Sequence, residues 1–206
     1  MKKILALIFL LLLFFSLTAQ NTNLLVIKKI NELLPSFLIK HTNADLRKQN
    51  LELENIEFYK VKKVFRVATL VQNADSKLPN EKNNYEILTG EKIIAAIFYE
   101  TQFCSAISTT ENNKSIKINN FEAVEGWEEL MKFETDEYRT FDKTVLTVEQ
   151  LNANFLILSN AKAEDEKYIF ALRNARFTIP TFKNSENKLF DYFAAYKLII
   201  EELRKK

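Results

Sequence analysis

Cys104 and His41 are the residues whose types could form a nucleophilic site, because an imidazole activates a thiol by taking its proton. The chain contains one Cys and one His, so this is the one pairing of its kind. Such a pair needs the imidazole within hydrogen-bond reach of the thiol and a third group that orients the ring. No catalytic motif surrounds either residue. The competing interpretation makes Cys104 a small buried strand residue and His41 a surface or capping residue after a helix.

Carboxylates offer a second route to catalysis. Glycosidase-type chemistry needs two carboxylates at a defined separation across a sugar site. The acidic runs Glu128–Glu129, Glu134–Glu137 and Glu164–Glu166 consist of neighbours in the chain, which do not face each other on a helix. We interpret them as solvated acidic surface. A secreted hydrolase or transferase that uses carboxylates, or Cys104 with His41, is therefore kept as the alternative function.

Several other classes of site are excluded by composition. A single His rules out zinc motifs that need two imidazoles. Gly90 and Gly126 are the only glycines, so the chain has no nucleophile elbow, dinucleotide-binding loop or phosphate-binding loop. With one Cys, no internal disulfide can form. We expect no metal and no cofactor, and turns that need positive φ must rely on Asn and Asp.

Aromatic side chains are the remaining feature that could serve binding. The densest group is Phe190, Tyr192, Phe193 and Tyr196, close to the end of the chain. Helical spacing predicts that Phe190, Phe193 and Tyr196 pack on a sheet and that Tyr192 points elsewhere. Tyr192 is thus the predicted ligand or partner contact.

The first residues have the order of a secretory signal. Lys2 and Lys3 precede an apolar run from Ile4 to Phe15, followed by smaller residues up to Ala19 and an abruptly polar stretch. The alternative is a signal anchor, but the apolar run is shorter than the roughly 20 residues that span a membrane. We expect cleavage near Ala19, which divides the chain into a signal peptide (1–19) and a single globular domain (20–206).

Removal of the signal would change the net charge. The chain has 29 Lys and Arg against 27 Asp and Glu, and two of the lysines lie in the signal. The remaining domain is formally neutral, so it has no overall field that would attract nucleic acid or an anionic membrane. We expect no nucleic-acid partner and no stable membrane anchor after cleavage.

The elements that would position these residues alternate in type along the chain. A helix is predicted at 23–39, with Leu24, Ile27, Ile30, Leu34 and Leu38 on its apolar face. Strand patterns follow at 51–71, with a break at Lys62-Lys63, and then at 85–89, 92–100, 103–110 and 114–118. Gly90 separates the second pattern from the third.

Helical patterns return in the last part of the chain. They cover 121–133, a segment from the capping box at Thr147–Gln150 to Ala161, and a long helix at 185–205. Residues 168–182 are ambiguous between strand and helix, with an extended end at 177–180. The order predicts an α+β fold in which an N-terminal helix precedes a central, mostly antiparallel sheet with C-terminal helices packing on it.

These observations favour an exported, non-enzymatic binding or interaction protein of the bacterial envelope, located in the periplasm or outside the cell. Its predicted partner is a protein or a small apolar ligand.

Overall fold

The computed structural model describes residues 23–72, 85–112, 115–122, 129–130, 138, 141–160, 163, 166–185 and 188–205. The predicted signal segment lies outside these residues. Two compact units are formed, each from two separate stretches of chain. The first unit contains Met1–Val64 and Ile93–Glu122, and the second contains Phe65–Lys92 and Ala123–Lys206.

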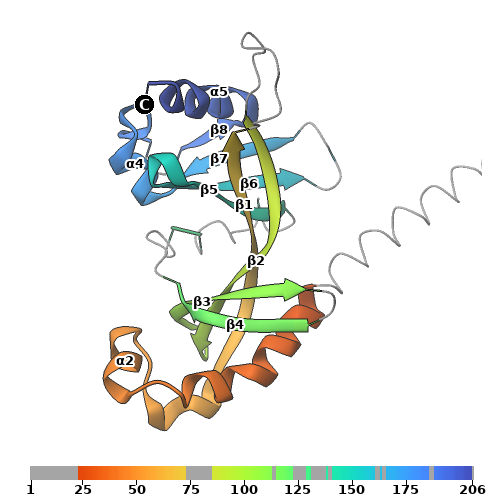
Figure 1. The fold of residues 1–206 in the computed structure, drawn as a ribbon, viewed down its shortest axis with the longest axis vertical. Coiled ribbons are helices and arrows are strands. Elements are labelled where there is room, and N and C mark those ends of the chain that lie inside the picture. Colours follow the sequence, from red (N-terminus) through yellow and green to blue (C-terminus); the bar gives the residue numbers. More distant parts are fainter. Residues whose placement is uncertain are drawn as a thin grey trace, which may run out of the picture. The chain divides into compact units, whose positions relative to one another are not determined.

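A helix over residues 23–38 begins the described part of the first unit (Figure 1). Its buried residues are Val26, Ile30, Leu34 and Leu38, spaced four apart so that they lie on one face. The predicted helix is therefore confirmed with one correction. Leu24 was expected on the apolar face, but it is exposed because the buried stripe starts at Val26.

Two shorter helices follow and close the core of the first unit. Helix α2 (Asn43–Lys48) begins at Thr42, whose hydroxyl accepts a hydrogen bond from the backbone N–H of Asp45 at 3.2 Å. The hydroxyl donates in turn to the Asp45 carboxylate at 2.7 Å, which holds the pKa of Asp45 below its usual value. The 3-10 helix η1 (Leu53–Phe58) occupies the stretch in which a strand was predicted.

Strands β1 (Tyr59–Gln72) and β2 (Tyr85–Tyr99) are long and uninterrupted, and residues of both belong to both units. The predicted break at Lys62-Lys63 is wrong, because each lysine finds a partner beside the strand. The Lys62 ammonium donates to the carbonyl of Glu100, and Lys63 lies 5.6 Å from the ring centre of Phe98.

The predicted break at Gly90 is also wrong. A Cβ built on Gly90 would meet no atom nearer than 3.8 Å, and its φ lies outside the left-handed region. An extended strand therefore passes through it without needing a glycine.

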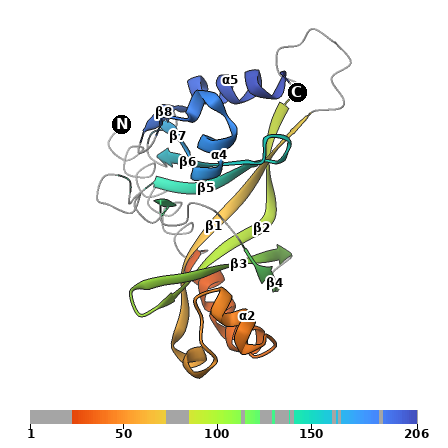
Figure 2. The ribbon, with the colours of Figure 1, turned by 90° about the vertical axis from the view of Figure 1, so that its left-hand side faces the viewer.

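Strands β3 (Gln102–Asn112) and β4 (Ser115–Phe121) complete the first unit as an antiparallel pair. Their register shifts between Ser108 and Thr109, and the buried Thr109 hydroxyl donates to the carbonyl of Ile93 at 3.3 Å. Figure 2 shows α2 beneath these two strands. Leu46 of α2 and Ile107 of β3 belong to the same buried cluster, so the helices cover one face of the strands.

In the second unit, β1 pairs in parallel with β5 (Phe141–Val148), and Arg66–Thr69 align with Thr144–Thr147. Strands β6 (Ala153–Asn160), β7 (Lys167–Ala171) and β8 (Leu189–Asp191) follow as successive antiparallel neighbours. The predicted helix from Thr147 to Ala161 is wrong. After the 3-10 turn η2 (Glu149–Leu151), Asn152 adopts φ 48° and turns the chain into β6.

Helices α4 (Arg173–Thr178), η3 (Pro180–Phe182) and α5 (Tyr192–Leu203) belong to the second unit. The ambiguous stretch 168–182 is thus strand followed by helix. The predicted extended segment at 177–180 is wrong, because α4 and η3 occupy most of it. The predicted helix at 185–205 begins only at Tyr192, since Asp191 caps it and Leu189–Asp191 pair with β7.

The eight strands of the described residues form one sheet in the order β4-β3-β2-β1-β5-β6-β7-β8. The α+β class is confirmed, and the sheet is mixed because β1 and β5 run parallel. Among the residues that the structure describes, no helix is both long and apolar enough to cross a membrane. Most of the predicted helix at 121–133 lies outside those residues, and Phe121 itself ends β4.

Candidate functional site

Cys104 lies near the start of β3 and is half-buried beside the core of the first unit. Its thiol donates weakly to the carbonyl of Gln102 over 3.6 Å. Burial raises the pKa of this thiol, and a hydrogen bond from the backbone of Tyr99 opposes the rise only in part. A raised pKa lowers the fraction of thiolate, which is the reactive form. This environment favours the protonated thiol over the reactive thiolate.

His41 follows the helix over 23–38 and lies between two aromatic rings. Its ring centre is 4.8 Å from that of Phe37 and 4.9 Å from that of Phe121. Within the described ranges, no hydrogen bond or ring contact joins His41 to Cys104. The catalytic pair stays a hypothesis that lacks the contact needed for its proton transfer.

Tyr192, the predicted contact residue, is the first residue of α5 and is half-buried. It stacks on Tyr196, with ring centres 6.1 Å apart and planes 14° apart. The Lys167 ammonium lies 6.0 Å from the centre of the Tyr192 ring. Burial raises the pKa of both tyrosines, and the Tyr196 hydroxyl donates to the carbonyl of Tyr85 at 3.0 Å. These tyrosines therefore fix the start of α5 on β2.

Phe193 is the aromatic residue of α5 that faces solvent, with 73% of its surface exposed. The expectation that it packs on the sheet is wrong, because the phase of α5 is set by Ala195, Ile199 and Leu203, which are buried. Tyr192 lies three residues before the buried Ala195, so these two residues share one side of the helix. Phe193 is the next residue after Tyr192, which turns its side chain about 100° away from that of Tyr192 around the helix axis. Asp191 caps α5 by accepting from the N–H of Ala194 at 3.0 Å. That N-cap was the sequence signal that could have given the correct phase.

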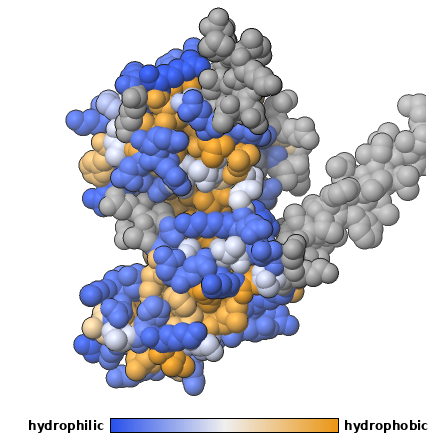
Figure 3. Space-filling view, viewed as in Figure 1, coloured by the Kyte–Doolittle hydropathy of each residue, from blue (hydrophilic) through white to orange (hydrophobic). Residues whose placement is uncertain are grey.

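Apolar residues also reach the surface elsewhere. Figure 3 shows apolar side chains on the visible face of both units. Phe177 of α4 is 75% exposed, but the Arg173 guanidinium lies 5.5 Å from the centre of its ring. Phe193 instead has Tyr192 as its ring neighbour, at 5.4 Å. The start of α5 is therefore an aromatic surface, which we define as Tyr192, Phe193 and Tyr196.

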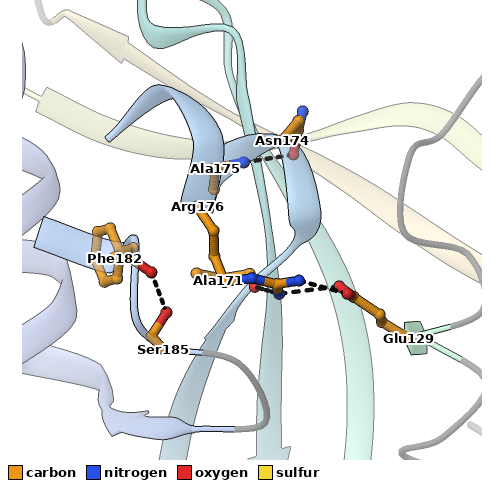
Figure 4. Close-up of polar contacts among 7 residues, drawn as sticks. All are labelled: Glu129, Ala171, Asn174, Ala175, Arg176, Phe182 and Ser185. Carbon is orange, nitrogen blue, oxygen red and sulfur yellow. Dashed lines mark hydrogen bonds and ion pairs between the residues drawn. The ribbon is translucent and has the colours of Figure 1, made fainter. Parts of the chain in front are cut away.

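An ion pair in the second unit was not anticipated from the sequence. The Arg176 guanidinium donates to both oxygens of Glu129, at 3.1 and 2.5 Å, and to the carbonyl of Ala171 at 2.8 Å (Figure 4). Their side chains are only 11% and 15% exposed. Such a forked pair has the geometry of a strong charge-assisted contact. It ties the chain at Glu129 to α4 and β7, which makes it a structural feature.

Asn174 organises the same end of α4 through its side-chain amide. Its oxygen accepts from the N–H of Ala175 at 2.8 Å, which Figure 4 shows, and from the N–H of Asn154 at 3.1 Å. The nearby Ser185 hydroxyl is buried and donates to the carbonyl of Phe182 at 2.6 Å. These polar groups are occupied within the fold, so none points to a ligand.

Metal-binding groups of acidic side chains are not found in the part of the chain that the structure describes. There, no group of three His, Cys, Asp or Glu side chains could hold a metal ion. Glu129 is engaged by Arg176, and Glu166 accepts from the Asn160 amide at 2.5 Å. The runs at 134–137 and 164–165 lie outside the described residues.

Comparison with known proteins adds no functional assignment. No family model, curated protein or solved structure matches this chain.

Proposed function

We propose that this chain is an exported, non-enzymatic binding protein whose aromatic surface at the start of α5 contacts a protein or a small apolar ligand. The observation that carries the proposal is the exposure of Phe193 on a helix whose neighbouring side chains are fixed. Aromatic residues are enriched at protein interfaces, and a few anchor residues supply most of the binding energy there. Phe193 contributes little to the core, so binding explains its large exposed side chain better than packing does.

The surroundings of Phe193 support a preformed contact surface. Tyr196 is held by its hydrogen bond to Tyr85, and Tyr192 stacks on Tyr196. A side chain on a helix that is already ordered loses less conformational entropy on binding than one on a flexible loop. The surface therefore needs little rearrangement to meet a partner.

The alternative, a secreted hydrolase or transferase, has less support. The Cys104 thiol has a raised pKa and hydrogen-bonds to a backbone carbonyl near it in the chain. His41 contacts two phenylalanine rings. Both environments favour structural roles, and Glu129 is neutralised by an arginine.

We also propose where the mature protein acts and which residues it contains. Residues 1–19 are removed as a signal peptide, and the remaining single domain acts in the periplasm or outside the cell. In this domain the N-terminal and C-terminal helices pack on the sheet. It binds no nucleic acid and has no stable membrane anchor.

Affinity capture tests the proposal directly. Purified residues 20–206 and a Phe193→Ser variant are exposed to an envelope fraction, and the captured proteins are identified by mass spectrometry. Native mass spectrometry of the same samples detects a small apolar ligand. We expect a partner or ligand that is retained by the parent protein and lost from the variant.

Phe177→Ser is the matched control, because Phe177 is equally exposed but lies on α4 beside Arg173. This variant should retain whatever the parent protein captures. Equal loss from both variants, or equal retention by both, overturns the assignment of binding to α5. Loss of a phenotype in Cys104→Ala or His41→Ala variants that remain folded would favour the enzyme.

A further inference from the structure

We draw no further inference here: the strongest candidate, the outer edge of strand β4 (Ser115–Phe121) in the first unit, is an unpartnered strand edge, and nothing in the described residues shows what pairs with it.

Discussion

Arg176 shows how much one side chain contributes to the second unit. Its guanidinium joins the Glu129 carboxylate to the carbonyl of Ala171, and the pair is mostly shielded from water. Removing one partner of a buried pair leaves the other charge without compensation. We expect Arg176→Met to lower the free energy of unfolding by about 3–5 kcal/mol in urea denaturation.

Two controls separate the ion pair from a general effect of losing an arginine. Arg173→Met, at an exposed position three residues earlier, loses only the contact with the Phe177 ring and should change stability by no more than about 1 kcal/mol. The double variant Arg176→Met, Glu129→Leu should recover most of the loss, because no charge is left buried. Equal destabilisation of the single and double variants would contradict the uncompensated charge as the cause.

Asn31 has a comparable role in the first unit, where its side chain binds the backbone as a neighbouring strand does. Its amide donates to the carbonyl of Val61 at 2.9 Å and accepts from the N–H of Val61 at 2.7 Å. Asn31→Ala leaves both backbone groups without a partner, and we expect a loss of about 1–3 kcal/mol in urea denaturation. Glu32→Ala, exposed on the same helix, is the control and should be near neutral.

Cys104 gives a pH-dependent prediction. Because burial raises its pKa, the folded protein holds the thiol proton more tightly than the unfolded chain does. Stability should therefore decrease as the pH rises above the pKa of the unfolded thiol. Alkylation by iodoacetamide at pH 8 should be slower in the folded protein than in urea. The ratio of the rate in urea to the rate in the folded protein should decrease as the pH is raised. A ratio that does not change with pH would show that shielding alone slows the reaction.

At the scale of elements, the phase of α5 decides which side chains are available for binding. Ala194 is exposed and Ala195 is fully buried, although they are neighbours of the same size. Ala195→Leu should lower stability by about 1–3 kcal/mol, because extra methyl groups have no room in the packed core. Ala194→Leu should be within about 0.5 kcal/mol of the parent. Thermal denaturation of the two variants checks this, and the reverse order would mean that the helix is turned differently.

The sequence predicted periodic elements better than it predicted their ends. The helix over 23–38 repeats its buried residues every fourth position, so its location was predictable. The segment Phe155–Leu158 is buried on both faces between β5 and β7, and such a run reads equally as helix or strand. The capping pattern at Thr147 favoured a helix there, but tertiary pairing with β5 prevailed.

The candidate site was predicted in part. The sequence indicates the aromatic group of α5, but a helix that begins near 185 would place Phe190 on the same face as Phe193 and leave Tyr192 apart from them. Phe190 instead lies in β8. The shortage of glycine was read correctly as a demand on other residues, since Asn50 and Asn152 take positive φ. A third positive φ falls on Glu100, in the β2–β3 turn, which composition could not indicate.

For the whole molecule, the sharing of β1 and β2 between the units has an effect on cooperativity. Neither unit is a continuous stretch of chain, so neither can be cut out without breaking both strands. We expect Leu34→Ala, in the core of the first unit, to cost about 2–5 kcal/mol. Hydrogen exchange should show the same loss of protection in β6 of the second unit. Protection in β6 that is unchanged would mean that the units unfold independently, and would contradict the proposed single domain.

The parallel pair of β1 with β5 has a consequence for the order of events during synthesis. Arg66–Thr69 leave the ribosome long before Thr144–Thr147, which later pair with them. Until then, the backbone of β1 on that side offers unpaired donors and acceptors to any other extended chain. We therefore expect one edge of β1 to remain open to misassociation during the synthesis of residues 73–140. The emergence of β5 closes this interval.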